Sequence, residues 1–404
     1  MYNSEKSLIM HVDLNSAFAT IEQQSRPLLR GRPVAIVNRL TEHTSIITAS
    51  YEAKKLGVKV GMRYTEAIKL VPKLVALESD PAKYRFVYQK LMAILNDYSP
   101  HVVMKSIDEG VVDFHHLPNP PSLIEIGYEI KQRLRDEIGI VMRCNVGIGP
   151  NRFLAKTAAG LHKPDGLDII DATNLREVYK TLKLTDLTGI AEAMERRLNA
   201  VGIFTPIEFL DASRVVLEKI VFKSICGGQW YERLRGYEVD DVTSDTKTIG
   251  RQYVLENRNL KHDEITARLH NLCESVGSRL RLQNKVARGI YVYVKTDEHK
   301  YWHTSQMFQL PFYSDGTINS LAQQLFFKAP CGIREIGIHC YELSNNDNTQ
   351  ASLFNDQLVR EQHLVNSIDA INQRFGERMV HSADTLNTSR EVKVKIPFGS
   401  TRYL

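Results

Sequence analysis

Three acidic side chains interrupt very apolar stretches of this sequence. Asp13 follows the run 8–12, and Asp108 and Glu109 stand side by side between two runs rich in valine. Acids at such places are costly unless something positive or solvated compensates them. In one interpretation all three are solvated turn residues. In the other they converge on divalent cations, because Mg²⁺ prefers oxygen ligands and is held by carboxylates together with substrate phosphates.

The second interpretation would allow phosphoryl transfer, since two ions about 3.5–4 Å apart stabilise the attacking and leaving oxygens. It carries a structural condition. Strict alternation along a strand would put Asp108 and Glu109 on opposite faces of a sheet. Both reach one site only if the strand begins at a hairpin turn there, which the sequence permits and does not establish.

The elements that would position these carboxylates alternate between strand and helix over residues 1–168. The apolar residues of 123–138 recur at the i, i+3, i+4 and i+7 spacing of a helix packed on a core. We expect an α/β arrangement around one sheet. The predicted strands are 8–12, 33–37, 45–50, 102–107, 111–114 and 144–148, and the predicted helices are 51–56, 64–71, 83–98, 123–138 and 152–161.

The remaining chain divides into a helical segment, an α+β module and a tail. Residues 169–241 contain no convincing strand, and 242–247 form a polar link. Residues 248–343 predict the order strand, helix, two strands, helix, strand, with the best strands at 289–294, 301–308 and 333–341. The tail, 344–404, opens with a polar linker at 344–349; 364–375 looks helical and 392–396 alternates like a strand.

Composition describes a soluble multidomain protein. Of 404 residues, 43% are hydrophobic and 25% charged, which disfavours collagen-like or wholly disordered chains. No apolar run approaches the roughly 18 residues of a membrane helix. The five cysteines are scattered without a CxxC pair, which indicates a reducing cytoplasm. The net charge of +5 permits a polyanionic partner without requiring one.

Several motifs in this order resemble those of the Y-family DNA polymerases, the lesion-bypass enzymes. The segments 11–19 and 106–109 resemble the two catalytic motifs of that family, and 48–54, 145–149 and 154–166 continue the likeness. The resemblance implies a right-hand polymerase, a multidomain α/β and α+β fold. Its palm would be 1–18 and 79–168, its fingers 19–78, its helical thumb 169–241 and its α+β little finger 248–343.

The same resemblance implies a catalytic centre. Asp13, Asp108 and Glu109 match the metal-binding carboxylates of the family, and the backbone carbonyl of Leu14 would be a further ligand. The cofactor would be two Mg²⁺ ions in each active site. Asn15 stands where many relatives have a second aspartate, and the chain is not assigned to the UmuC-like or the DinB-like branch.

A nucleotide site follows from the same matches. Phe18, beside Ala17, matches the aromatic steric gate that favours deoxynucleotides; alone it could be a core aromatic. The residues that match the triphosphate site of the family are Thr48, Tyr51, Lys54 and Lys163. Hydroxyl and ammonium groups suit phosphate oxygens, although the lysines could equally be solvated surface charges.

Two regions could hold DNA. Segments 187–191 and 200–203 resemble a helix-hairpin-helix, in which Gly189 and Ala191 would offer backbone N–H groups to a phosphate; the alternative is an ordinary helical packing unit. In the α+β module, basic side chains lie on or beside strands and would bind a DNA backbone without reading sequence, or else form a charged outer face. These residues are Lys247, Arg251, Arg288 and Lys295.

The tail contains a pentapeptide, 350–354, that resembles the peptide by which bacterial polymerases bind the sliding clamp. Its contact residues would be Gln350, Ser352, Leu353 and Phe354. An exposed Leu-Phe pair needs a partner surface to bury it. The other partners implied are primer-template DNA, a dNTP and an accessory protein of UmuD type, with no membrane and a monomeric state.

We therefore predict an error-prone, template-directed DNA polymerase of the DNA-damage response, without a proofreading exonuclease. A non-catalytic DNA-bound adaptor is the first alternative, disfavoured because all three carboxylates are present. A nucleotidyl cyclase is the second, disfavoured by the thumb, the basic module and the clamp-like peptide.

Overall fold

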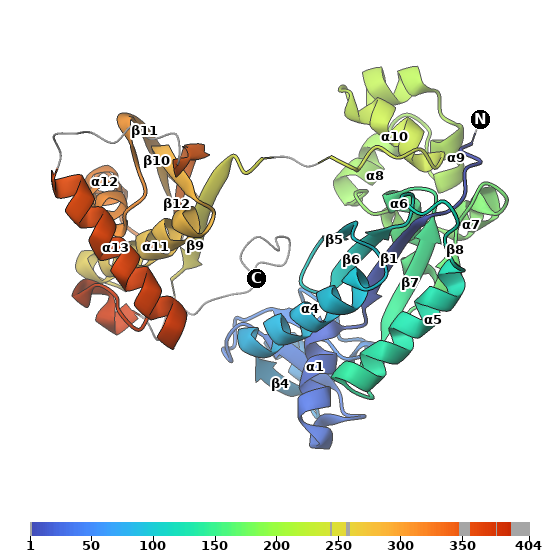
Figure 1. The fold of residues 1–404 in the computed structure, drawn as a ribbon, viewed down its shortest axis with the longest axis horizontal. Helices are drawn as coiled ribbons and strands as arrows, with labels where there is room; N and C mark the ends of the chain where they lie inside the picture. The colour runs from blue at the N-terminus through green and yellow to red at the C-terminus, as the bar shows by residue number, and fades with distance from the viewer. Residues whose placement is uncertain (1, 243–244, 256–258, 347–355, 377, 389–404) are drawn as a thin grey trace. The chain divides into compact units, whose positions relative to one another are not determined.

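The computed structural model of the chain describes residues 2–242, 245–255, 259–346, 356–376 and 378–388 (Figure 1). The chain separates into two compact units, one ending at Val242 and the other spanning Thr243–Val394.

The first unit is built on a five-stranded sheet with the order β5-β6-β1-β7-β8. Its strands are β1 (Ile9–Leu14), β5 (Val102–Met104), β6 (Glu109–Asp113), β7 (Cys144–Gly149) and β8 (Leu167–Ile169). Strand β1 lies at the centre, antiparallel to both β6 and β7. It is almost entirely buried, as its apolar sequence predicts.

The two faces of this sheet are covered differently. One face packs against α1 (Ala17–Ser25), α4 (Pro81–Asn96) and α5 (Leu123–Arg133) in a large apolar core. The other face, which contains His11 and Val111, lies against α6 (Arg152–Leu161), with only a small apolar cluster. That second face is therefore the one able to hold polar side chains.

Helix α6 packs unusually close to β7 because glycines stand in the strand. A Cβ atom on Gly147 would overlap the backbone of Ala155 and Ala159, and one on Gly149 would lie 2.7 Å from the nitrogen of Ala155. The helix begins at Asn151, whose side chain accepts a hydrogen bond of 2.7 Å from the Leu154 nitrogen. The side chains of α6 are thus brought down onto the sheet.

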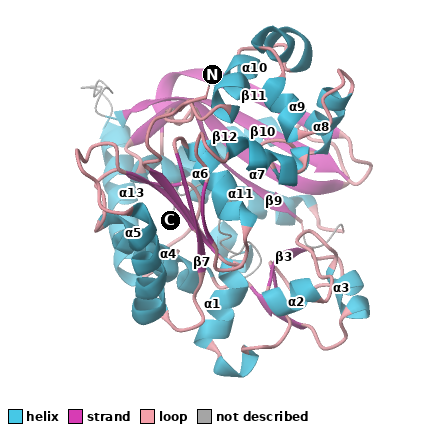
Figure 2. Ribbon diagram, turned by 90° about the vertical axis from the view of Figure 1, so that its right-hand side faces the viewer, coloured by secondary structure: helices cyan, strands magenta, loops and turns pink. Residues whose placement is uncertain are grey.

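The prediction of one sheet in this region is wrong, because β2 pairs into a separate three-stranded sheet. The order is β3-β2-β4, with β2 (Val34–Val37), β3 (Ile46–Ala49) and β4 (Val75–Glu78). Strand β2 is buried throughout and forms its own core with α2 (Tyr51–Lys55) and α3 (Tyr64–Leu70). Figure 2 shows β3, α2 and α3 apart from β7 of the larger sheet. The short strands β4 and β8 were not predicted.

Residues 171–242 contain helices and no strand, as predicted. The α-helices are α7 (Leu175–Thr181), α8 (Glu192–Asn199), α9 (Pro206–Asp211) and α10 (Cys226–Leu234), with a π-helical turn at Val216–Val221. Their core is centred on aromatic side chains: the Trp230 ring lies 5.4 Å from both Phe153 of α6 and Phe209 of α9. The helical segment is thereby joined to the α6 side of the five-stranded sheet.

The second unit has the predicted order of strand, helix, two strands, helix, strand. These elements are β9 (Thr248–Val254), α11 (His262–Leu282), β10 (Lys285–Thr296), β11 (Tyr301–Phe312), α12 (Asp315–Phe326) and β12 (Ile333–Asn345). The sheet is antiparallel with the order β11-β10-β12-β9, and α11 and α12 cover one face. The strands extend beyond the predicted limits, so Ser344 and Asn345 belong to β12 rather than to a linker.

The predicted helix in the tail is present and packs on this second unit. Helix α13 runs from Asp356 to Phe375. Arg281 of α11 donates to Asp369 at 2.6 and 2.9 Å and to Asp315 at 2.8 Å. Arg378 lies 2.6 Å from Glu274 of α11. The described part of the tail therefore adds a layer held largely by ion pairs; the predicted strand 392–396 lies outside the described residues.

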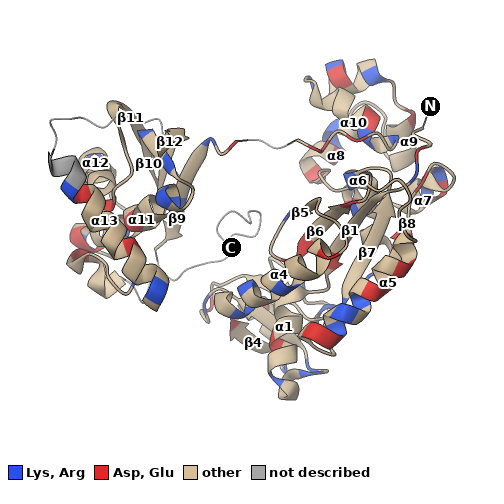
Figure 3. Ribbon diagram, viewed as in Figure 1, with Lys and Arg blue, Asp and Glu red and all other residues tan. Residues whose placement is uncertain are grey.

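Charged residues of both signs are spread over the two units, for example along α5 (Figure 3). Within the described ranges, no helix is long and apolar enough to cross a membrane.

Candidate active site

A hairpin turn, which the sequence left open, joins β5 and β6. The backbone nitrogens of Lys105 and Ser106 donate to the carbonyl of Glu109 at 2.9 and 3.3 Å. Strand β6 begins at Glu109, directly opposite Asp13 of β1. Residues opposite each other in antiparallel strands project to the same face, so Asp13 and Glu109 share the α6 face. Asp108 lies in the turn, and its carbonyl accepts from the Leu14 nitrogen at 2.9 Å.

The surroundings of Asp108 disfavour its ionised form. Burial raises its pKa, and the negative charges of Asp13 and Glu109 raise it further. A hydrogen bond of 2.5 Å from the Ser106 hydroxyl opposes this only in part. A cation placed among these groups would relieve the repulsion.

Glu109 is held by two basic side chains. His11 Nε2 lies 3.1 Å from its Oε2, and Lys156 Nζ of α6 donates to the same oxygen at 2.6 Å. Burial acts to raise the pKa of Glu109, but these hydrogen bonds and charges outweigh it and hold the pKa at about 2. The carboxylate is therefore ionised at neutral pH.

Asp13 contacts Lys163, which is carried on the loop 162–166. Asn15 anchors this loop, because its Oδ1 accepts from the Asp165 nitrogen at 2.8 Å. Its Nδ2 donates at 2.8 Å to Asn145, which in turn donates to the carbonyl of residue 162 at 3.1 Å. An amide can bridge in this way because it both donates and accepts; Asn15 therefore has a structural role here.

The donor set fits a hard divalent cation. Within the described ranges, no three His, Cys, Asp or Glu side chains are arranged to hold a metal ion as they stand, and the lysines contact two of the carboxylates instead. Asp13, Asp108 and Glu109 nevertheless supply the oxygen ligands that Mg²⁺ prefers. Their mutual repulsion at Asp108 gives a physical reason for binding positive charge.

Two of the predicted triphosphate residues lie beside Asp13 and Lys163. Lys54 Nζ donates to the Ser16 hydroxyl at 2.8 Å and lies 4.8 Å from the centre of the Tyr51 ring. Burial lowers the pKa of Lys54, and the charge of Lys163 lowers it further. Burial and the charge of Asp13 raise the pKa of Tyr51. The structure thus gathers a phenol and two ammonium groups around one carboxylate.

Phe18 is buried next to this cluster. Its ring stacks on Tyr84 of α4 with centroids 4.2 Å apart and an angle of 7° between the planes. The neighbouring Ala17 is also buried. Thr48 is half-buried in β3, opposite Ile36 of β2. The roles of these three residues stay predictions, and the support from Tyr84 was not predicted.

The helical hairpin has the expected turn but an acidic helix start. Gly189 has a φ of +102°, and a Cβ there would lie 3.1 Å from Trp230. Ala191 is the N-cap of α8, whose first turn contains Glu192 and Glu195. Acids at a helix N-terminus stabilise the helix but compete with a phosphate for the same N–H groups. Phosphate binding at Ala191 stays a prediction.

The basic residues predicted for the second unit do not share one face. Lys295 lies on β10, 3.0 Å from Glu335, and Arg288 donates to the Phe308 carbonyl at 3.2 Å. Lys247 is exposed. Arg251, however, is opposite the buried Ile338 and contacts Ser275 of α11, so it lies on the helix-covered face. Sequence alternation alone could not decide which face of β9 is covered.

The predicted clamp-contact residues, Gln350, Ser352, Leu353 and Phe354, lie outside the described residues.

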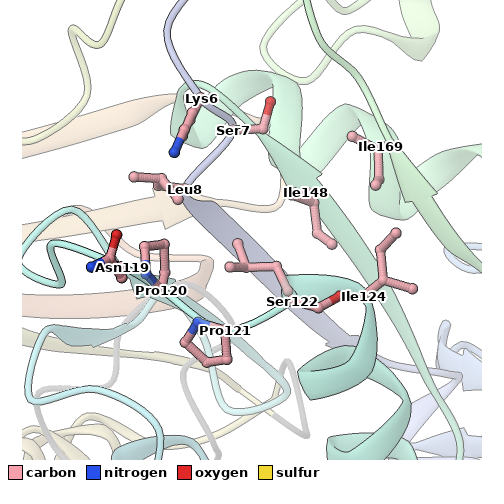
Figure 4. Close-up of a pocket in the computed structure, with 11 residues that line it drawn as sticks. Lys6, Ser7, Leu8, Asn119, Pro120, Pro121, Ser122, Ile124, Ile148 and Ile169 are labelled. Atoms are coloured by element: carbon pink, nitrogen blue, oxygen red, sulfur yellow. The ribbon is translucent and has the colours of Figure 1, made fainter.

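Two cavities lie near β1. One of about 320 Å³ is lined by His11 and Lys156 and by Gly189 and Trp230 of the helical segment. The other, of about 350 Å³, is near Leu8 at the start of the strand and is lined by apolar residues such as Ile148 and the prolines before α5 (Figure 4). The first cavity is lined by the two side chains that contact Glu109, His11 and Lys156.

Sequence reasoning missed several contacts of the site. His11 stands two residues before Asp13, so strand alternation could have placed it on the same face. No local pattern marks the contact of Lys156 with Glu109, because it depends on how α6 packs on the sheet. The additional contacting residues are His11, Ser16, Tyr84, Ser106 and Lys156.

Family profiles and individual relatives point to the same protein family. The profile of the impB/mucB/samB family matches residues 12–160, and that of the family's C-terminal domain matches 246–353. The chain is 33% identical over 403 residues to DNA polymerase IV of Moorella thermoacetica, covering 96% of this chain and 98% of that protein. It is 27% identical over 399 residues to DNA polymerase IV 1 of Bacillus subtilis, covering 96% and 95%.

Solved structures agree on the fold. The Y-family DNA polymerase chimera Dbh-Dpo4(243-245)-Dbh superposes with a TM-score of 0.71 at 24% identity, covering 84% of this chain and 99% of that one. An insertion ternary complex of Dbh DNA polymerase gives a TM-score of 0.59 at 24% identity, with the same coverage. The predicted multidomain fold is thereby confirmed.

Proposed function

Since this chain belongs to the impB/mucB/samB (UmuC/DinB) family, we propose that it extends a DNA primer along a template. It is a Y-family, lesion-bypass DNA polymerase that adds dNMP to the primer 3′-OH and releases pyrophosphate. The observation that best supports this activity is the meeting of Asp13, Asp108 and Glu109 at one end of β1, beside Lys54 and Lys163.

We propose that Asp13, Asp108 and Glu109, with the Leu14 carbonyl, hold two Mg²⁺ ions. When bound, such ions lower the pKa of the primer hydroxyl and stabilise the charge on the leaving pyrophosphate. Lys163 contacts only one oxygen of Asp13, Oδ2, so the other oxygen could hold a cation while the ammonium stays beside it. An ammonium at this position would also be available to the triphosphate of the dNTP.

The remaining residues bind and select the nucleotide. Lys54 and Tyr51 project from α2 toward Asp13 and would donate to phosphate oxygens. Phe18 is held by its stacking on Tyr84, so it cannot easily yield to a ribose 2′-OH. This arrangement gives the steric-gate role a supporting contact.

The domain division and the partners are also part of this proposal. The palm would be 1–18 and 79–168, with the fingers, thumb and little finger at 19–78, 169–241 and 248–343. The sliding clamp would bind through 350–354, and a UmuD-type protein is a further candidate partner. We also propose a cytoplasmic location, since the substrate is DNA.

The test is primer extension with Mg²⁺ and dNTPs by the parent and by Asp108→Asn, with primer-template affinity measured by fluorescence anisotropy for both. We expect extension by the parent and a loss of about 10²–10³ in rate for the variant, with equal DNA affinity. The variant would lose a ligand of the cations that stabilise the developing charge. Tight DNA binding without extension by the parent would favour the adaptor function instead.

A further inference from the structure

Glu109 is held by only one of its two carboxylate oxygens. His11 Nε2 and Lys156 Nζ both contact Oε2, at 3.1 and 2.6 Å. Within the described residues, no hydrogen bond reaches Oε1, although the side chain is only 17% exposed. Oε1 is not among the fully buried side-chain atoms that lack a partner within the described residues. It is therefore accessible, and the arrangement leaves this oxygen open to a further partner.

The two holding groups come from different elements. His11 is 1% exposed in β1, two residues before Asp13, and lies between Val111 of β6 and Gly147 of β7. Lys156 comes from α6, which the glycines of β7 allow to pack tightly on the sheet. Both contacts are therefore set by rigid parts of the fold.

His11 is not the side chain that would stabilise the folded protein most at this position. Its Nδ1 is buried and has no hydrogen-bond partner among the described residues. An unsatisfied buried polar atom is unfavourable, whereas an apolar side chain of similar size would carry no such cost. The favourable contribution of His11 is thus concentrated in its contact with Glu109.

We propose that His11 and Lys156 are positioning residues that fix Oε2 of Glu109 so that Oε1 serves as a ligand for a divalent cation. This inference rests on the proposed function, because it assumes that Glu109 is a metal ligand. Groups of this kind orient the ligand rather than touch the metal, and their loss typically costs 10–100-fold in metal affinity.

The test is Mn²⁺ binding to the full-length protein, followed by the electron paramagnetic resonance signal of free Mn²⁺. The protein is saturated with matching dNTP and with primer-template whose primer ends in a dideoxynucleotide, so no reaction occurs. We expect His11→Leu and Lys156→Met to weaken the weaker Mn²⁺ site at least tenfold. His11→Gln and Lys156→Arg, which keep a donor, should restore affinity to within about threefold.

Two controls separate positioning from folding. The thermal midpoint of His11→Leu should stay close to that of the parent, because removal of the orphaned Nδ1 offsets the loss of the Nε2 contact with Glu109. Lys105→Met removes a positive charge from the same cavity, changes no side-chain contact of Glu109 among the described residues, and should leave Mn²⁺ affinity unchanged. A general charge effect would instead weaken binding in both lysine variants.

Failure of the positioning role can be distinguished from failure of the proposed polymerase function. If the parent extends primers and binds Mn²⁺ but His11→Leu and Lys156→Met bind it equally well, the positioning role is refuted and the polymerase function stands. If the parent neither extends primers nor binds Mn²⁺ in the complex, the proposed function itself is refuted, and this inference with it.

Discussion

The close approach of α6 to β7 makes a quantitative prediction about Gly147. A Cβ at this position would lie well inside 3.0 Å of the backbone of Ala155 and Ala159, which no side-chain rotation can relieve. The helix must therefore shift away from the sheet. Overpacking of this kind costs about 1–3 kcal/mol, and backbone overlap places Gly147→Ala near 3 kcal/mol.

Gly160 is the matched control, because it lies within α6 and a Cβ there meets nothing within 4 Å. Alanine in a helix interior is favoured over glycine by about 0.5–1 kcal/mol, so Gly160→Ala should stabilise the protein. The same chemical change is thus expected to have opposite signs at two neighbouring sites.

Urea unfolding followed by tryptophan fluorescence measures both effects. Trp230 reports on the first unit and Trp302 on the second, so all variants should be made in a Trp302→Phe background. Gly147→Ala should also lower primer-extension activity, because the shift moves Lys156 away from Glu109. Equal stability of Gly147→Ala and the parent would refute the inferred packing of α6.

Three further predictions concern polar groups of the site. Because the pKa of Glu109 is lowered to about 2 from 4.5, its ionised form stabilises the fold above about pH 4.5, and that contribution is lost as the pH falls toward 2. The stability advantage of the parent over Glu109→Gln should therefore shrink from pH 6 to pH 3. Asp108→Asn should slow extension by about 10²–10³ yet raise the free energy of unfolding at pH 7, since burial and like charges disfavour the ionised Asp108. Asn15→Ala should cost about 1–3 kcal/mol and raise the KM for dNTP, because the 162–166 loop loses its anchor.

Each of these three predictions would be contradicted by a specific result. A pH-independent difference between the parent and Glu109→Gln would mean that the basic contacts do not hold the carboxylate. Destabilisation by Asp108→Asn would show that the native carboxylate is already compensated. An unchanged KM in Asn15→Ala, with kcat also unchanged, would separate the loop from nucleotide binding.

Many elements were predictable because their signals are local. The helix 152–161 was predicted with its observed limits, and the order of elements in 248–343 follows from alternating apolar patterns. The short strands β4 and β8 were not, since three or four residues carry little periodicity and their pairing partners are remote. For the same reason the separate sheet of β2, β3 and β4 was missed.

The sequence by itself determined which side chains could do chemistry, because acids that end apolar strands and the motifs around them are readable within a few residues. Tertiary structure alone decided what those side chains touch. The contact of Glu109 with His11 joins residues 98 apart, and that of Asp13 with Lys163 joins residues 150 apart. Such contacts depend on strand register and on the depth to which a helix packs on a sheet, which are set by long-range packing that no local pattern records.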